Sequence, residues 1–352
     1  MDNHSLPASW WTSPKLYELE KRAVFHKAWF YITHSDRIAV GDKMHFNVAD
    51  VQFYLVKDET GIVSAHKDIV GTGLDNRLVS HTTLQGLVFV NFDSSEEGPL
   101  PFDEYYAGIE NEMREFDFSQ YEFYTSFHLD GKFNWKAIVD AYQECYHCPT
   151  AHPELSKAFE MPSYRVTPKT RWCRHYADVA EEKIDTRKNK SNRVSDFDGL
   201  WMYTFPMSGV NCYSPAWYSF RMLPQSVDRT ILQYDVYKRK DGDQKEIDEF
   251  TRFMWQLNQE DFALCEATQE NLKTGVYSTG FLHPEKEKGV LYYQNLIKNM
   301  VLEHFELEKQ SGRIIDPATI GNEPSEVSAA EAAAEMADAS LQVNSATSIP
   351  IV

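Results

Sequence analysis

The feature that most constrains this chain is a helical pattern that meets a proline between two histidines. His147 and His152 stand on either side of Pro149, which cannot continue a regular helix. Residues 134–148, NWKAIVDAYQECYHC, have helical spacing, with an apolar face made of Trp135, Ile138, Val139, Tyr142 and Tyr146. In an unbroken helix the two histidines would point roughly 140° apart. One metal ion could bind both only if the helix ends between them, as Pro149 predicts; two unrelated histidines are the plain alternative.

A third metal ligand is predicted in a long helix from about residue 244 to about residue 272. Asp261 falls in the middle of its apolar stripe, whose other members are Phe250, Met254, Leu257 and Leu264. A buried carboxylate without a partner is costly, so Asp261 needs a counterpart. That counterpart is a metal ion or an ion pair at the helix edge, and the spacing alone leaves both open.

Cys145 and Cys148 offer a competing use of the same segment. Their spacing is that of one half of a zinc knuckle, which His147 and His152 could complete as a structural zinc site. No second pair exists, because the other cysteines stand alone at Cys173, Cys212 and Cys265. A redox CxxC is less favoured still, since no thioredoxin-like βαβ pattern surrounds it. We therefore expect Cys145 and Cys148 to bind no metal.

Three segments carry a family resemblance: LPASWWTSPKLYELEKRAVFHKAWFYITH near the N-terminus, NWKAIVDAYQECYHCPTAHPEL, and QEDFALCEATQENL. They resemble the α-subunits of Rieske non-heme iron oxygenases, especially the choline and carnitine monooxygenase branch, over most of residues 5–308. The resemblance implies an iron(II) site made of His147, His152 and Asp261, which leaves positions for oxygen and substrate. It also implies an α+β fold with an antiparallel, helix-grip (START-like) catalytic domain.

The N-terminal part departs from that family. Family members hold a [2Fe–2S] cluster with a C-x-H and a C-x-x-H motif, whereas no cysteine precedes Cys145 here. His66 and His81 remain, but histidines without thiolates cannot assemble a Rieske centre. Only a short connection links GIVSAH, which ends at His66, to GLVFVNFD, which begins at Gly86. We therefore predict no [2Fe–2S] cluster and a truncated β remnant of the cluster domain.

Without the cluster, electrons for dioxygen activation must come from elsewhere. An oxidisable substrate could supply them, and so could an external reductant or a partner protein. Glu144 matches the acidic residue through which the family passes electrons across a subunit boundary to the iron. In this chain Glu144 is predicted to orient a histidine or to carry a proton, with a solvated helix position as the plain alternative.

The remaining pattern divides the chain into three predicted parts: residues 1–120, 121–312 and 313–352. The first part is predicted to contain a helix over 14–30, antiparallel strands within 43–66 around a turn at 58–61, and a strand over 86–93. Besides the metal segments, the second part is predicted to contain aromatic-rich strands over 200–237 and a helix over about 286–308. The third part is low in complexity, which predicts a disordered tail.

Composition narrows the function classes. The net charge of −18 argues against a broad affinity for nucleic acid or anionic membranes. No apolar run reaches the roughly 20 residues of a membrane span, and no secretion signal is visible. An odd number of dispersed cysteines favours a cytoplasmic location. In the fold implied by the resemblance, five aromatic residues are candidates for the wall of a pocket: Trp201, Tyr203, Phe205, Trp217 and Phe220. For any one of them, core packing is the commoner role.

These inferences predict an iron(II)- and oxygen-dependent oxygenase that oxidises a small organic substrate, aromatic compounds included. An aromatic cage for a quaternary ammonium is a less favoured analogy with the choline branch. The family assembles as trimers, so a homo-oligomer is expected. Two other classes stay open: a metal-dependent hydrolase or lyase that uses its ion as a Lewis acid, and a non-catalytic binding subunit. The intact ligand residues argue against the second.

Overall fold

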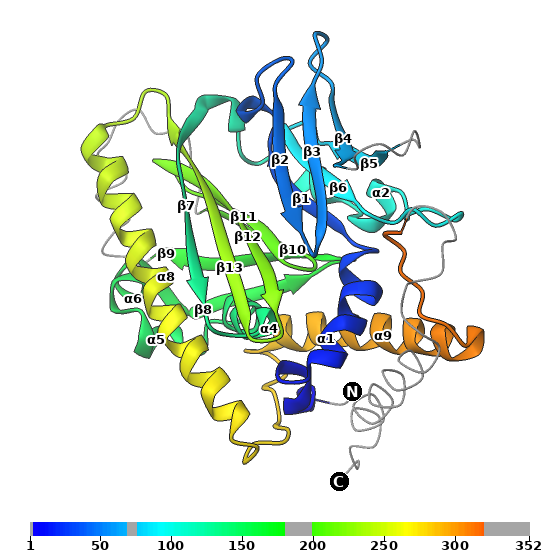
Figure 1. Cartoon of the computed structure of the whole chain (residues 1–352). Helices are drawn as coiled ribbons and strands as arrows, with labels where there is room; N and C mark the ends of the chain where they lie inside the picture. Colours follow the sequence, from blue (N-terminus) through cyan, green and yellow to red (C-terminus); the bar gives the residue numbers. More distant parts are fainter. Residues whose placement is uncertain (1–2, 69–75, 180–198, 320–352) are drawn as a thin grey trace.

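The fold consists of two antiparallel sheets with helices packed around them (Figure 1). The computed structural model describes residues 3–68, 76–179 and 199–319. The six-stranded sheet has the strand order β1-β6-β5-β4-β3-β2, and the seven-stranded sheet has the order β7-β13-β12-β11-β10-β9-β8. The predicted α+β class with antiparallel sheets is confirmed.

The bounds of the elements are as follows. The first sheet contains β1 (Trp29–His34), β2 (Lys43–Val48), β3 (Val51–Lys57), β4 (Val63–Lys67), β5 (Arg77–Thr82) and β6 (Leu87–Asn91). The second contains β7 (Tyr121–Gly131), β8 (Phe159–Pro168), β9 (Trp172–Val179), β10 (Leu200–Thr204), β11 (Ser208–Cys212), β12 (Ala216–Ser226) and β13 (Arg229–Arg239). The helices and helical turns are η1 (Ala8–Trp11), α1 (Pro14–Glu20), η2 (Lys21–Phe25), η3 (Ser35–Arg37), α2 (Phe102–Tyr105), α3 (Ile109–Met113), η4 (Phe118–Gln120), α4 (Trp135–Tyr142), α5 (Cys148–Ala151), α6 (Pro153–Ala158), α8 (Gln244–Lys273) and α9 (Lys288–Ser311). Within the described residues, no helix combines the length and the apolar character needed to cross a membrane.

The predicted helix over residues 14–30 is wrong only in its last five residues, because the helical conformation ends at Phe25. Helix α1 begins after Ser13, whose side chain accepts a hydrogen bond from the backbone N–H of Leu16 at 3.3 Å. The π-helical turn η2 extends it to Phe25. Trp29 then opens strand β1, whose residues are all buried and which pairs with β6. The aromatic and β-branched residues of β1 favour a strand over a helix.

Strand β5 lies in the short connection before Gly86, where the sequence pattern did not predict a strand. It pairs with β4 on one side and with β6 on the other. Only Leu78 of β5 is fully buried, so the strand has little hydrophobic alternation to reveal it. The strands predicted within residues 43–66 and 86–93 are confirmed as β2, β3, β4 and β6.

Helix α8 lies along the seven-stranded sheet and ends within one residue of the predicted position (Figure 1). Its buried face is rotated from the predicted stripe, because Leu264 is 43% exposed. Polar residues take part in that face: Asn258 accepts a hydrogen bond from the Tyr234 hydroxyl, and Gln269 accepts one from a backbone N–H of the α4 cap. Asp261 consequently lies at the edge of the buried face, with its side chain 21% exposed.

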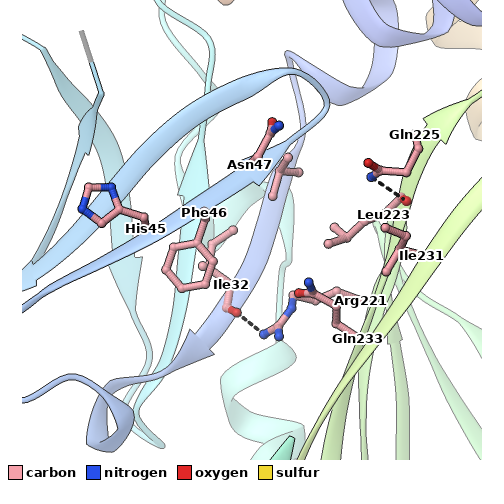
Figure 2. Close-up of a pocket in the computed structure, with 10 residues that line it drawn as sticks. Ile32, His45, Phe46, Asn47, Arg221, Leu223, Gln225, Ile231 and Gln233 are labelled. Atoms are coloured by element: carbon pink, nitrogen blue, oxygen red, sulfur yellow. Dashed lines mark hydrogen bonds between the residues drawn. The ribbon is translucent and has the colours of Figure 1, made fainter. Parts of the chain in front are cut away.

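A buried polar network joins the two sheets. Arg221 of β12 donates hydrogen bonds to the Ile32 carbonyl of β1 and to Asp235 of β13. Arg37 donates to the same Asp235 carboxylate at 2.6 Å. Beside this network lies a cavity of about 250 Å³ between strands β1 and β2 and strands β12 and β13 (Figure 2). None of the predicted metal ligands lines this cavity.

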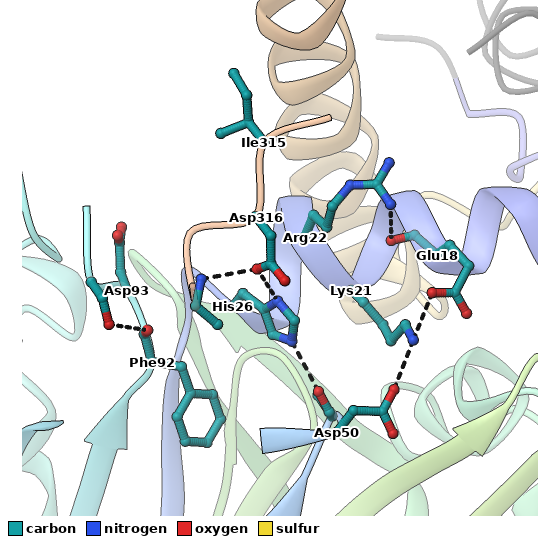
Figure 3. Close-up of polar contacts among 12 residues, drawn as sticks. Glu18, Lys21, Arg22, His26, Asp50, Phe92, Asp93, Ile315 and Asp316 are labelled. Carbon is teal, nitrogen blue, oxygen red and sulfur yellow. Dashed lines mark hydrogen bonds and ion pairs between the residues drawn. The ribbon is translucent and has the colours of Figure 1, made fainter. Parts of the chain in front are cut away.

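The C-terminal end of the described chain returns to the N-terminal helix (Figure 3). His26 contacts Asp316 through its Nδ1 atom at 2.6 Å. Arg22 donates to the carboxylate of Glu308 near the end of α9 at 2.7 Å. Residues 313–319, which the predicted boundary assigns to the tail, therefore lie against the folded part. The rest of the predicted tail lies outside the described residues.

Candidate metal centre

The segment between α4 and α6 positions the two histidines. Helix α4 ends at Tyr142, so the helix predicted to run to residue 148 is too long and the break at Pro149 is wrongly placed. Pro149 lies instead in the first turn of α5, where a missing N–H leaves no helical hydrogen bond unmade. His147 precedes this short helix and His152 follows it. The two histidines therefore flank a single helical turn, and this lets both face one point.

Two imidazole nitrogens and one carboxylate oxygen converge on that point. The Nε2 atoms of His147 and His152 are 3.1 Å apart. The Oδ1 atom of Asp261 lies 3.3 Å from the first Nε2 and 3.0 Å from the second. Ligand atoms about 2.1 Å from one ion and at right angles to each other lie roughly 3.0 Å apart. The spacing of these three atoms thus suits three adjacent ligands of one divalent ion.

A second carboxylate stands behind each histidine. Glu144 accepts a hydrogen bond from Nδ1 of His147 through its Oε1 atom. Glu260 accepts one from Nδ1 of His152 through its Oε2 atom at 2.9 Å. A neutral imidazole with its proton on Nδ1 presents a lone pair at Nε2. The two carboxylates therefore fix the tautomers that turn ligand lone pairs toward the common point.

Of the two carboxylates, only Glu144 was predicted from the sequence. Glu144 was assigned to histidine orientation or proton transfer, and its side chain is 12% exposed and directed at His147. It lies outside helix α4, because its Oε2 atom accepts the backbone N–H of Tyr146. Glu260 was missed. Its only signal is its place next to Asp261, and neighbouring helix residues point roughly 100° apart, which argues against a shared site.

Lone pairs that face one point require a cation between them. Burial lowers the pKa of His147, but hydrogen bonds with Asp261 and Glu144 outweigh it and raise this pKa to about 10. The pKa of His152 is also raised, because its contacts with Asp261 outweigh its burial. Burial raises the pKa of Asp261, yet the two histidines hold it below its usual range. Without metal, extra protons supply the positive charge, and a divalent ion would have to displace them.

Cys145 and Cys148 form a disulfide in this structure. This bond is not predicted by the cysteine pattern of the sequence. A disulfide offers no thiolate, so the pair in this state does not make the zinc half-site that its spacing suggested. The Sγ atom of Cys148 nevertheless lies 3.9 Å from Nε2 of His147. The other cysteines are free and buried, namely Cys173, Cys212 and Cys265.

The two N-terminal histidines have other partners. His66 contacts the Ser64 hydroxyl through its Nε2 atom at 3.0 Å. His81 contacts Glu110 through its Nε2 atom at 2.9 Å. His66 pairs across the sheet with Arg77, four residues before His81, which leaves roughly 13 Å of strand between the histidines. The two histidines therefore do not approach one another closely enough to share one ligand.

The aromatic residues proposed for a pocket wall are part of the core. Trp217 stacks on Tyr237 with ring centres 3.8 Å apart, and Phe220 contacts Tyr142 of α4. The whole set is buried: Trp201, Tyr203, Phe205, Trp217 and Phe220. Their first role is therefore packing in the protein interior, in line with the commoner role expected for such residues.

Comparison with known families identifies the class of protein that this fold and site define. Residues 118–303 match the model of the ring hydroxylating alpha subunit (catalytic domain). The match takes in more than half of the chain, so the chain belongs to this family. It is therefore an oxidoreductase of the iron-dependent oxygenase class, and the predicted family is confirmed.

Individual relatives agree with the predicted branch. The carnitine monooxygenase oxygenase subunit of Acinetobacter pittii is 23% identical over 350 residues, covering 83% of this chain and 94% of the relative. The chloroplastic choline monooxygenase of Amaranthus tricolor is 22% identical and covers 83% of this chain and 76% of the relative. A solved structure of the quaternary ammonium Rieske monooxygenase CntA has a TM-score of 0.72 at 20% identity, covering 84% of this chain and 95% of that one. The structural similarity shows that the fold is shared.

Proposed function

We propose that this chain is a non-heme oxygenase whose iron(II) is held by His147, His152 and Asp261. The observation that carries the proposal is the convergence of three ligand atoms within 3.3 Å of one another. When bound, iron(II) supplies the one-electron chemistry that dioxygen activation requires. Three protein ligands leave the remaining positions open for oxygen and substrate.

The surrounding residues hold the ligands and define the side of approach. Glu144 and Glu260 retain the Nδ1 protons of the histidines, so that Nε2 stays available in each ring. The His152 side chain is 2% exposed, whereas the side chains of His147 and Asp261 are each 21% exposed. Substrate therefore approaches from the side of His147 and Asp261.

We also propose that no [2Fe–2S] cluster of this chain feeds the iron and that the substrate supplies electrons. The sequence has no cysteine before Cys145, and thiolates are needed for a Rieske centre. The alignment with the Acinetobacter pittii subunit is 350 residues long, but it covers only 83% of the 352 residues of this chain. The relative thus carries residues without a counterpart here, as a truncated cluster domain would require.

The favoured substrate is a small, readily oxidised organic compound such as a phenol or a hydroquinone. Such a molecule can give up electrons itself, which fits an iron site without a cluster. A quaternary ammonium compound is the second candidate, because the relatives named above are carnitine and choline monooxygenases. Hydroxylating a saturated carbon consumes two additional electrons, so this candidate requires a separate reductant.

The two candidates are separated by oxygen consumption in the presence and absence of a reductant. The protein is loaded with iron(II) without oxygen, freed of excess metal and mixed with oxygenated buffer and a hydroquinone, choline or carnitine. We expect repeated turnover of the hydroquinone without reductase or nicotinamide, and labelled dioxygen shows whether its atoms enter the product. Turnover of choline or carnitine, only with added reductant, would replace the first candidate by the second.

Matched variants distinguish a wrongly assigned metal site from a wrongly assigned source of electrons. His147→Ala should bind iron(II) poorly and lose turnover, whereas His128→Ala, an exposed histidine on β7, should retain both. Turnover of a substrate without oxygen would favour the hydrolase or lyase class. Stoichiometric iron binding without turnover of any substrate would favour a binding subunit.

Three further expectations belong to the same proposal. The parts 1–120, 121–312 and 313–352 are proposed as the N-terminal remnant, the catalytic domain and the tail. The protein is proposed to form a homo-oligomer in the cytoplasm. Light scattering at micromolar concentration tests the assembly, and a monomer would contradict it.

A further inference from the structure

Cys148 places a sulfur atom next to the proposed metal position. Its Sγ atom lies 3.9 Å from Nε2 of His147, the nitrogen that faces Asp261. Ligand atoms of His147, Cys148 and His152 all lie within 4.8 Å of one another. The proposed oxygenase site has no use for this sulfur.

The disulfide determines whether this sulfur can bind a metal. In the disulfide to Cys145 the sulfur of Cys148 carries no charge and is a weak ligand. As a thiolate it would be a strong ligand for a soft or borderline ion such as zinc. A thiolate and an imidazole nitrogen that share a tetrahedral zinc ion lie roughly 3.6 Å apart. The present separation of Cys148 Sγ from Nε2 of His147, 3.9 Å, exceeds this value by a few tenths of an ångström.

A reductant would reach the disulfide through Cys145. Cys148 is 3% exposed, whereas Cys145, in the segment between α4 and α5, is partly exposed. A thiolate of a dithiol reductant attacks the sulfur of Cys145, and the sulfur of Cys148 leaves as a thiolate. The second thiol of the reductant then releases Cys145 and closes the reductant's own disulfide. Two electrons pass to the cysteine pair, and the protein ends with two reduced sulfurs.

We propose that the Cys145–Cys148 pair switches the site between two metal-binding modes. With the disulfide formed, His147, His152 and Asp261 make the open, three-ligand site on which the proposed function rests. After reduction, Cys148 becomes a fourth ligand, and the site takes zinc in a closed, four-ligand arrangement. The fourth ligand occupies a position that an oxygenase must keep for oxygen or substrate.

Cobalt(II) binding tests this proposal without any activity measurement. Cobalt(II) adopts the same sites as zinc and shows a thiolate-to-metal charge-transfer band only when a thiolate coordinates it. The oxidised protein should bind cobalt(II) without this band. Protein reduced with a phosphine and then freed of it should bind cobalt(II) with the band, and its affinity for zinc should rise by roughly tenfold or more.

Cysteine variants assign the band to one sulfur. Cys145→Ser frees Cys148 permanently and should show the band without reduction. Cys148→Ser should bind cobalt(II) without the band in either state. Cys265→Ser is the matched control, because this buried thiol follows Asp261 by one helical turn, and its band should equal that of the wild type.

The outcomes distinguish this proposal from the proposed function. Cobalt(II) bound by the reduced wild type without the band would overturn the switch and leave the three-ligand site standing. A band retained in Cys148→Ser would also overturn it. Failure of the oxidised protein to bind any divalent ion would contradict the three-ligand site itself. Reduction of the wild type creates the free thiols without a substitution, so the test does not depend on the folding of a variant.

Discussion

Replacement of Glu260 gives a direct measure of how strongly the second carboxylates support the metal site. Its Oε2 atom accepts the Nδ1 proton of His152 at 2.9 Å, and its Oε1 atom accepts a hydrogen bond from Gln256 at 3.0 Å. Glu260→Gln keeps the volume and can keep one acceptor, but it removes the charge that makes the imidazole a stronger ligand. Glu260→Ala removes the acceptor as well. Losing such a partner typically weakens metal binding about 10- to 100-fold.

We therefore expect iron(II) affinity to fall about tenfold in Glu260→Gln and about a hundredfold in Glu260→Ala. These losses correspond to about 1.4 and about 2.7 kcal/mol of binding free energy. Anaerobic competition against a chelator of known affinity provides the measurement. Glu270→Gln, an exposed carboxylate on the same helix, is the control and should match the wild type.

Thermal unfolding of the metal-free variants checks that the effect belongs to the site. The Glu260 side chain is 25% exposed, so its loss should change the free energy of unfolding by less than about 1 kcal/mol. Affinities within twofold of the wild type for both variants would refute the reasoning. Orientation of His152 would then come from backbone packing around α5 alone.

Three other predictions concern the pKa of His147, a buried ion pair between Lys136 and Glu20, and the bound metal. The pKa of His147 is raised from 6.5 to about 10 in the metal-free chain, so its contribution to stability is fully present below pH 6.5 and is lost as the pH rises through about 10. Over this interval metal affinity should increase with pH. Metal titrations at pH 7 and pH 9 would show this increase. Lys136→Met should lower the free energy of unfolding in urea by about 3–5 kcal/mol, because it leaves Glu20 buried without its ion pair, and adding Glu20→Gln should restore most of the loss. Metal at a free concentration of a hundred times its Kd should stabilise the protein by about 2.7 kcal/mol. A chelator should therefore lower the Tm of the loaded protein.

The long helix shows what local pattern can predict. Asp243 caps α8 by accepting the backbone N–H of Lys245 at 2.7 Å, and the helix then runs to Lys273. Its ends are set by residues close in sequence, so the prediction is accurate there. Its buried face is set by hydrogen bonds to other elements, which a hydrophobic pattern does not register, and the predicted stripe is accordingly rotated.

The metal segment shows where local pattern fails. The helical spacing of residues 134–148 continues past Tyr142, but the chain leaves the helix there. Glu144 instead accepts the backbone N–H groups of Tyr146 and His147 and the ring proton of His147. That arrangement depends on Asp261 from a distant helix, which holds the same histidine. Helix geometry correctly predicted that His147 and His152 cannot face one point from one continuous helix. It did not predict that α4 ends at Tyr142, before both histidines.

Interactions between the two sheets give the N-terminal strands a structural role that does not depend on cluster cysteines. Tyr31 of β1 donates to the Ser219 hydroxyl of β12 at 3.0 Å. Arg37 and Arg221 share the Asp235 carboxylate, which is 1% exposed. Removing the first sheet would leave Asp235 with one guanidinium fewer and would expose apolar side chains of one continuous core. The six-stranded sheet thus stabilises the seven-stranded sheet whether or not it binds a cluster.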